Sequence, residues 1–295
     1  MKAQNKNMAL PFSTPLQNAQ LECASQEVLD NLAAYVEKKT LMQFGEDRRN
    51  HFINTIATRT QAVGAPDMET YIKRVSSPGG DAEFMMLVDA LTINETTFFR
   101  NVPQIEMFAR VALPEVIDRK RAAGETNKRL DVWSAACSTG QEVYTLGMLG
   151  LDVLSSYPGW ELRILGTDIS HSVLETAKQG IYQKSRLETM PPAMLTRYFD
   201  MVGDKIRVKD VVRRITTFQY HNLNDPLPMR QFDVIFCRNV MIYFSREEQA
   251  RLAQKFKDRL TPGGFLFIGH SESLHGLGVD LQLRIQDRGV AYQKV

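Results

Sequence analysis

The segment Leu130–Glu142, LDVWSAACSTGQE, has the residue types of a nucleotide-binding turn. It predicts a buried strand, a tight loop of small residues with one glycine, and the start of a helix. A second predicted strand, ELRILGTDIS, places Asp168 at its C-terminal end. In open α/β sheets, small residues at the first turn let the backbone approach the ligand, and an acid after the second strand binds ribose hydroxyls. The turn is not GxGxxG, so the pattern favours a mononucleoside cofactor over a dinucleotide. The alternative is an ordinary strand–helix–strand crossover with small residues at its bend.

Strands alternate with helices from Arg129 to the C-terminus. This alternation is the element order that would place the small-residue loop between a strand and a helix. The predicted strands read LDVWSAAC, ELRILGTDI, ITTFQY, FDVIFC and GGFLFIGH, followed by a hairpin around Asp287–Gly289. Near-continuous apolar strands separated by helices are typical of a parallel sheet covered on both faces, and the final hairpin adds antiparallel character at one edge. The Val-, Ile- and Arg-rich segment near 200–220 predicts a short antiparallel β insertion. Capping boxes at Ser172–Glu175 and Ser245–Glu248 predict two helix starts.

The chain divides into four predicted parts. Residues 1–20 are polar with scattered prolines and are expected to be a disordered tail. Apolar residues at helical spacing fill 21–92, with a helix start at Pro66–Asp67 and a break at Ser76–Gly80, which predicts a small all-α domain. Residues 93–110 form a linker that contributes to the cofactor site, and 111–295 form the α/β domain.

Composition excludes several classes of function. The chain of 295 residues has 36 Lys and Arg against 34 Asp and Glu, so its net charge of +2 gives no basic field for nucleic acid. Cys23, Cys137 and Cys237 lack CxxC spacing, so we expect neither a metal centre nor a disulfide framework, and a reducing cytoplasm fits. No run approaches the roughly 20 apolar residues of a membrane span. We therefore expect a cytoplasmic protein, monomeric, with no membrane insertion.

Five motifs in one order give a more specific indication. They are NETTFFR (94–100), WSAACSTGQEVYT (133–145), GTDIS (166–170), FDVIFCRNVMIYF (232–244) and GGFLFIGHSESL (263–274). Together they closely resemble the chemotaxis receptor methyltransferase family, CheR. The resemblance implies a Rossmann-like methyltransferase that transfers a methyl group from S-adenosylmethionine to glutamate side chains of chemoreceptors and releases S-adenosylhomocysteine. The family's loop usually reads STGEEPY, so Gln141 and Val143 are departures, whereas Glu142 keeps the second acid.

Such a reaction makes modest demands on the protein. A glutamate side chain is ionised at neutral pH, with a reference pKa of about 4.3, so it is a nucleophile without a general base. The sulfonium donor becomes neutral as the methyl leaves, so catalysis is mainly alignment and exclusion of water. We therefore expect a site with no His/Asp dyad or metal, and with neutral or cationic groups that position a carboxylate.

Three residues carry the main site predictions. Asp168 is expected to bind the ribose diol, the alternative being a simple helix N-cap. Glu142 is expected to bind the methionine amino group, the alternative being an acid favoured by the helix dipole. Arg100 is expected to point into the cleft, anchored by the preceding Phe98 and Phe99, and to hold the cofactor carboxylate or the incoming glutamate, since guanidinium binds carboxylates bidentately. The alternative is a surface arginine.

The resemblance implies further contacts. The alternatives are a turn-forming role for Asn222 and a core aromatic ring with its hydroxyl at the rim for Tyr243. Tyr243 would orient the acceptor, and the expected cofactor contacts beyond those above are Asn94, Thr96, Ala135, Asn222, Leu223, Arg238 and Asn239. His270, Ser271 and Glu272 end a strand and receive no role.

The expected partners are the cytoplasmic helices of chemoreceptors, which the family approaches with a basic helix. Here that helix carries Arg48, His51, Thr55 and Arg59 on one side. A solvated helix face is the alternative. The insertion around Arg207–Thr217 is the candidate for binding a receptor's C-terminal peptide. Two other functions stay open: methylation of a different carboxylate, on a small molecule or another signalling protein, and a non-catalytic scaffold that binds S-adenosylmethionine.

Overall fold

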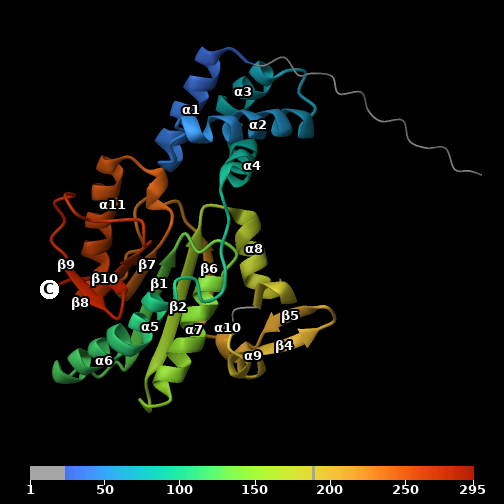
Figure 1. The fold of residues 1–295 in the computed structure, drawn as a ribbon. Coiled ribbons are helices and arrows are strands. Elements are labelled where there is room, and N and C mark those ends of the chain that lie inside the picture. The colour runs from blue at the N-terminus through green and yellow to red at the C-terminus, as the bar shows by residue number, and fades with distance from the viewer. Residues whose placement is uncertain (1–23, 188–189) are drawn as a thin grey trace, which may run out of the picture.

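The computed structural model describes residues 24–187 and 190–295, apart from the side chain of Arg186; the predicted tail lies outside these ranges. Four helices come first: α1 (Gln26–Thr40), α2 (Glu46–Ala62), α3 (Met68–Ser76) and α4 (Asp81–Leu91). They pack on one another and lie together at one end of the molecule (Figure 1). Asp67 caps α3 by accepting a hydrogen bond from Thr70 N at 2.7 Å, so the predicted helix start is confirmed. None of the helices in the described ranges is long and apolar enough to cross a membrane.

A seven-stranded sheet forms the body of the molecule, with strand order β6-β2-β1-β7-β8-β10-β9. Its strands are β1 (Arg129–Ala135), β2 (Glu161–Asp168), β6 (Thr216–Tyr220), β7 (Phe232–Cys237), β8 (Leu260–Ile268), β9 (Gln282–Gln286) and β10 (Gly289–Gln293). The first five pair in parallel, and β10 pairs antiparallel with β8 and β9. The predicted C-terminal hairpin is confirmed, and its two-residue turn has positive φ at Asp287 (47°) and Arg288 (68°).

The order of the strands reverses beside β1. Strands β2 and β6 follow on one side of it, whereas β7 and β8 lie on the other. The carboxyl ends of neighbouring strands diverge at such a reversal and leave a crevice for a ligand. The loops after β1, β2, β6 and β7 therefore meet at one edge of the sheet.

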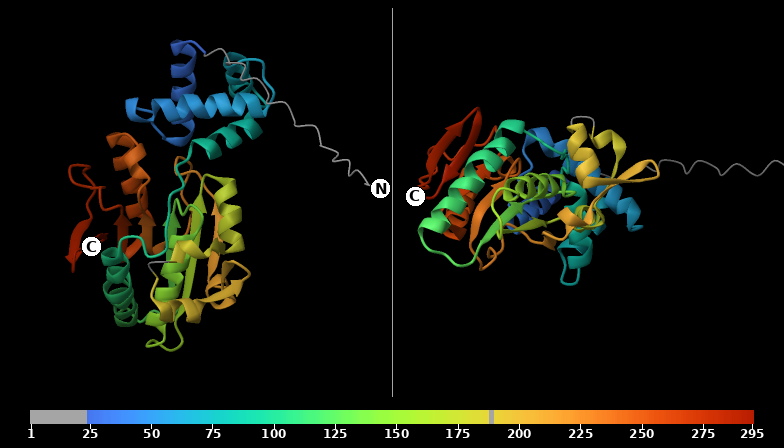
Figure 2. Two further views of the ribbon diagram at one scale, coloured as in Figure 1. Left: turned by 45° about the vertical axis from the view of Figure 1, so that its right-hand side comes forward. Right: turned by 90° about the horizontal axis from the view of Figure 1, so that it is seen from below.

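Helices cover both faces of the sheet, as the apolar strands predict (Figure 2). Alternate residues of one strand face opposite sides. Trp133 packs against Phe256 of α11 (Arg246–Arg259), whereas its neighbour Val132 belongs to the same buried cluster as Leu146 of α7 (Gln141–Leu154). The α7 face is also covered by a continuous helical segment made of α5 (Val102–Met107), a π turn (Phe108–Ala112) and α6 (Leu113–Ala122). The sheet is thus fixed from both sides behind the crevice.

The antiparallel insertion is present, but it lies earlier in the chain than predicted. Its strands are β3 (Ile181–Gln183), β4 (Phe199–Val202) and β5 (Lys205–Val208), in the order β3-β5-β4, with α9 (Pro192–Tyr198) before β4. The insertion therefore runs from 181 to 208 and not from 200 to 220. Residues 216–220 instead form β6, which pairs in parallel with β2 at the edge of the main sheet. Both 181–208 and 216–220 contain short apolar strands, so the sequence pattern alone does not show which strands belong to the insertion and which to the main sheet.

One of the two predicted helix starts is confirmed. Ser245 caps α11 and accepts a hydrogen bond from Glu248 N at 3.2 Å. The prediction for Ser172 is wrong, because α8 (His171–Gln179) begins earlier and Ser170 is its cap. Asp168 Oδ1 accepts a hydrogen bond from Ser170 N at 3.0 Å, which turns the chain directly after β2 and lets the helix start at once.

Candidate cofactor-binding site

A cavity lies at the carboxyl ends of β1, β2, β6 and β7, where the strand order reverses. It has about 1070 Å³ of empty volume, part of it open to solvent. The strand ends contribute 136–138, 168–169, 221–223 and 238–240, with Tyr243 beyond them. The segment 92–97 with Arg100 closes a second side, and Thr40, Met42 and Arg48 close the end nearest the helical domain. Nearly all of the predicted site residues therefore meet in one place.

Asp168 is buried at the end of β2, with 6% of its surface exposed. Its Oδ2 accepts a hydrogen bond from Ser138 N at 2.8 Å, and its Oδ1 accepts the one from Ser170 N. Burial raises the pKa of the Asp168 carboxyl, and the backbone hydrogen bonds act in the opposite direction. A carboxylate has about four acceptor positions, so two remain toward the cavity. This arrangement fits a ribose diol, which offers two hydroxyl donors.

A buried ion pair forms the other end of the cavity. Arg238 Nη1 donates to Glu142 Oε2 at 3.0 Å, and Ser134 Oγ donates to Glu142 Oε1 at 2.8 Å. Only 3% of the Arg238 side chain and 14% of the Glu142 side chain are exposed. From the sequence, we expected Glu142 and Arg238 to be separate cofactor contacts. In the structure they form an ion pair with each other. An adjacent carboxylate and guanidinium are complementary to the ammonium and carboxylate of an amino acid.

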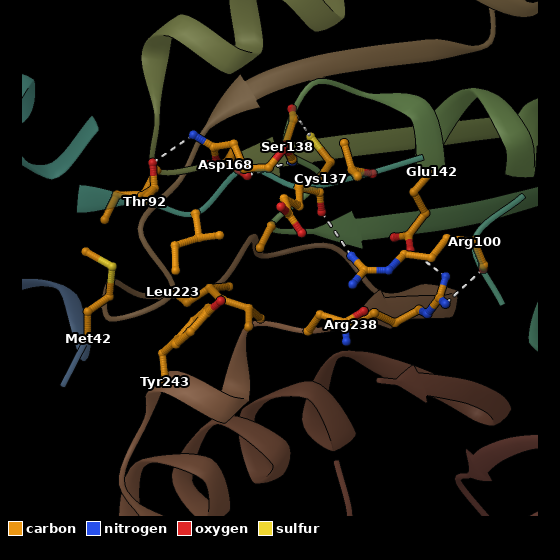
Figure 3. Close-up of a pocket in the computed structure, with 18 of the residues that line it drawn as sticks. Met42, Thr92, Arg100, Cys137, Ser138, Glu142, Asp168, Leu223, Arg238 and Tyr243 are labelled. Carbon is orange, nitrogen blue, oxygen red and sulfur yellow. Dashed lines mark hydrogen bonds and ion pairs between the residues drawn. The ribbon is translucent and has the colours of Figure 1, made fainter. Parts of the chain in front are cut away.

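Arg100 reaches into this charged end from the interdomain segment (Figure 3). Its carbonyl accepts a hydrogen bond from Arg238 Nη2 at 2.9 Å, and its Nη1 donates to the Glu95 carbonyl at 3.0 Å. The two phenylalanines before it hold the segment down: Phe98 is buried, and Phe99 N donates to Thr145 Oγ1 at 3.2 Å. The predicted anchor is therefore present, and the guanidinium keeps donors that no other described residue uses.

The apolar end of the cavity is formed by Leu223, Met42 and the ring of Tyr243 (Figure 3). Asn222 also borders the cavity, but its side chain has other partners. Its Nδ2 donates to the Lys39 carbonyl at 2.7 Å, and its Oδ1 accepts from Asn224 N at 3.0 Å. The turn-forming role is thus the one seen, and it fixes the strand end to α1 of the helical domain.

Asn94, Thr96 and Asn239 line the cavity as expected. The Asn94 carbonyl accepts a hydrogen bond from Ser138 Oγ at 3.1 Å, which ties the interdomain segment to the turn after β1. Ala135 is fully buried and is not among the described lining residues; its neighbour Ala136 takes that place. Ala135 is the last residue of β1, and its contact with a cofactor stays a prediction.

Left-handed backbone conformations cluster around the cavity. Phe99, Ala136, Ser138 and Asn239 have φ between 50° and 62°. Residues other than glycine rarely adopt this region, and such strain concentrates at functional sites. The sequence offers no signal for it at Phe99, Ala136 or Ser138, because none of these side chains favours positive φ.

The structure contradicts the prediction that Arg48, Thr55 and Arg59 form an exposed basic helix face. The Arg48 guanidinium is buried 4.4 Å from the Tyr243 ring centroid and donates to the Gln43 carbonyl at 3.0 Å. Burial lowers the pKa of Arg48. Arg59 is paired with Glu83 at 2.7 Å, and Thr55 is buried. Arg48 instead belongs to the wall of the cavity, where it stacks on a predicted site residue.

His221 is a second cavity residue that the sequence did not indicate. It follows β6, and burial lowers its pKa, so the ring is neutral at neutral pH. Its Nε2 is buried without a hydrogen-bond partner among the described residues, and its ring lies against Trp133. A histidine at a strand end has no distinguishing spacing, so only the fold reveals its place.

The fold and the cavity together define a Rossmann-like domain for an amino-acid nucleoside, with an acid for the ribose at one point and a guanidinium–carboxylate pair at the charged end. Residues 94–288 match the family model described as CheR methyltransferase, SAM binding domain. The chain therefore belongs to the CheR methyltransferase family and is an S-adenosylmethionine-dependent methyltransferase.

Relatives of this family align over most of the chain. A "Chemotaxis protein methyltransferase" of Salmonella typhimurium is 34% identical over 285 residues, 93% of each chain. One of Borreliella burgdorferi is 30% identical, covering 85% of this chain and 90% of its own. One of Vibrio parahaemolyticus is 38% identical, covering 70% of this chain and 74% of its own. The alignments thus extend beyond the α/β domain.

Proposed function

We propose that this protein transfers the methyl group of S-adenosylmethionine to glutamate side chains of chemoreceptors, producing glutamate methyl esters. The observation that carries the proposal is the position of Arg100, a cation with uncommitted donors at the charged end of the cofactor cavity. An anionic acceptor is the substrate that such a group would hold. The names of the relatives support a receptor of chemotaxis as the source of that anion.

When bound, the cofactor supplies an electrophilic methyl carbon, which bonds to a carboxylate oxygen while the electron pair of the broken carbon–sulfur bond stays on sulfur. The acceptor is already ionised and no proton moves, so no side chain has to act as a base. The contribution of the protein is alignment and exclusion of water. Asp168, Glu142 and Arg238 would orient the cofactor, and Arg100 would hold the acceptor.

Tyr243 is the second residue that we expect to act on the acceptor. Figure 3 shows its ring extending into the cavity from below. Its carbonyl accepts a hydrogen bond from Gln43 N at 2.9 Å, and Arg48 stacks on the ring, so both neighbours restrict its movement. A hydroxyl fixed in this way can donate to a carboxylate oxygen and set the direction of approach.

The acceptor has a route to Arg100 from outside. A second hollow shares Asn94–Thr97 and Arg100 with the cavity and extends to Gln141 and to Tyr182 of β3. Apart from Arg100 and Glu95, its lining residues are uncharged. We infer that a cytoplasmic helix of the receptor approaches here and inserts one glutamate side chain toward Arg100. The protein would then work in the cytoplasm as a monomer.

The antiparallel insertion is the proposed site for a receptor's C-terminal peptide. Its edge strands β3 and β4 each have one side that does not pair within the three-stranded sheet. An extended peptide can add to such an edge through backbone hydrogen bonds.

The test is methyl transfer to receptors from the same organism. The protein is incubated with S-adenosylmethionine labelled in the methyl group and with membranes that contain the receptors. We expect alkali-labile label on receptor-sized bands, and loss of that label when the receptor's candidate glutamates are changed to alanine. Label only on another protein or on a small molecule would replace the receptor as substrate. No transfer by a protein that binds the cofactor would favour the non-catalytic scaffold.

A further inference from the structure

Glu272 organises the loop after β7 without lining the cavity. Its Oε1 accepts hydrogen bonds from Val240 N and Ile242 N, both at 3.1 Å. Its Oε2 accepts hydrogen bonds from Asn239 N at 3.1 Å and from Gly269 N. Four backbone donors thus converge on one carboxylate, which matches the four acceptor positions of the ionised group.

The loop held in this way lines the cavity with five residues: Arg238, Asn239, Val240, Tyr243 and Phe244. Asn239 has φ of 59°, so its backbone is in a region that costs energy for a residue other than glycine. The backbone N–H groups of Asn239, Val240 and Ile242 point to one side, and Glu272 satisfies all three. The carboxylate therefore compensates for a loop conformation that the chain would not adopt by itself.

Gly269 shows how closely the carboxylate and the loop are fitted. A Cβ atom at this position would lie 2.6 Å from Glu272 Oε2 and 2.9 Å from Asn239 N. Contacts under 3.0 Å force a movement, and one of the two neighbours is backbone. Any side chain at 269 would therefore displace the carboxylate from the amides of the loop.

We propose that Glu272 is a positioning residue that sets cofactor affinity by fixing the conformation of 238–243. It acts through Arg238, which must reach Glu142, and through Asn239. The inference rests on the assignment of the cofactor site and not on the identity of the methyl acceptor. Its test therefore uses S-adenosylhomocysteine and the purified protein alone.

The informative substitution is Glu272→Gln, which keeps the shape of the side chain. The amide oxygen can still accept from one pair of N–H groups, but the amide nitrogen faces the other pair as a donor. Loss of hydrogen bonds to a charged group predicts that affinity for S-adenosylhomocysteine falls by at least about tenfold in calorimetry. Glu272→Asp keeps the charge and should recover part of the affinity.

Glu83→Gln is the matched control. Glu83 is a partly buried glutamate that accepts hydrogen bonds from Arg59 and Tyr71, and it is not among the described lining residues of the cavity. This variant should lose stability and keep its affinity for S-adenosylhomocysteine. Affinity losses in both variants that follow their loss of melting temperature would reduce Glu272 to a structural residue. Unchanged affinity in a folded Glu272→Gln protein would overturn the proposal outright.

Hydrogen exchange gives a second readout if Glu272→Gln does not fold. In the milder Glu272→Asp variant, the amides of Asn239, Val240 and Ile242 should exchange faster than in the wild type, together with weaker binding. Weaker binding with unchanged protection of these three amides would contradict the mechanism, because the loop would then be intact. Unchanged binding with faster exchange would contradict it equally, because the loop would then not matter for affinity.

Discussion

Replacing Asp168 by alanine should weaken cofactor binding more than it weakens the fold. The buried carboxylate has two acceptor positions left for the ribose after its hydrogen bonds with Ser138 N and Ser170 N. Leaving the buried ribose hydroxyls without their acceptor should cost about 1–3 kcal/mol of binding free energy. The dissociation constant for S-adenosylhomocysteine should rise by roughly 5- to 150-fold.

The effect on stability has two opposing parts. Burial raises the pKa of Asp168, so the ionised group is less favourable in the folded protein than in the unfolded chain, and its removal relieves this cost. The same substitution leaves the N–H groups of Ser138 and Ser170 without their acceptor. Asp168→Asn keeps one acceptor oxygen and removes the charge, so its melting temperature should stay close to that of the wild type.

The raised pKa also predicts how pH separates binding from stability. As pH falls through the folded pKa of Asp168, above the ordinary 3.8, the native state takes up a proton more readily than the unfolded chain, so this group adds stability. Protonation removes acceptor positions, so cofactor affinity should fall over the same range. The Asn variant should lack both trends.

Calorimetry with S-adenosylhomocysteine at several pH values, beside thermal denaturation, measures these effects. A folded Asp168→Ala protein that binds the ligand within twofold of the wild type would refute the assignment of the ribose. Affinity of the wild type that does not change while pH falls toward 4 would refute the role of the ionised carboxylate.

Three further predictions concern the rest of the cavity. Arg100→Ala should lower methyl transfer by at least about a hundredfold with little change in melting temperature, and Arg100→Lys should recover only part; near-normal turnover of the alanine variant would show that Arg100 does not hold the acceptor. Arg238→Met should lower the free energy of unfolding by about 3 kcal/mol in denaturant titrations, because it leaves Glu142 buried and unpaired. Adding Glu142→Leu should restore part of that loss. If the effects of the two substitutions simply add, the two residues are not coupled. Tyr243→Phe should keep the affinity for S-adenosylhomocysteine and lower turnover about tenfold, and weaker binding instead would make it a cofactor residue.

Local sequence patterns predicted the parts of the site that local structure determines. Asp168 is at the end of a strand because an apolar run stops there, and the turn after β1 is small because the backbone bends sharply. The anchoring of Arg100 by Phe98 and Phe99 follows from two large apolar residues beside one charge. These features depend on a few neighbouring residues, so they can be predicted from the local sequence.

Other features depend on residues that are far apart in the chain. Glu142 and Arg238 are separated by 96 positions, and each was expected to face the cofactor, because nothing local reveals that they pair. Arg48 was expected on an exposed helix face that meets the receptor, because helical periodicity cannot show that Tyr243 packs over it. Asn222 and Glu272 owe their roles to backbone groups of other elements. Such contacts appear only when the topology brings the strand ends together.

The most direct test of the account is a crystal structure of the protein with S-adenosylhomocysteine. We predict that the ribose hydroxyls donate to the Asp168 carboxylate, that the adenine lies toward Leu223, and that the amino-acid end lies beside Glu142, Arg238 and Arg100. A nucleoside bound in the reverse direction would contradict the assignment of the site. So would a nucleoside bound away from the cavity at the carboxyl ends of β1, β2, β6 and β7.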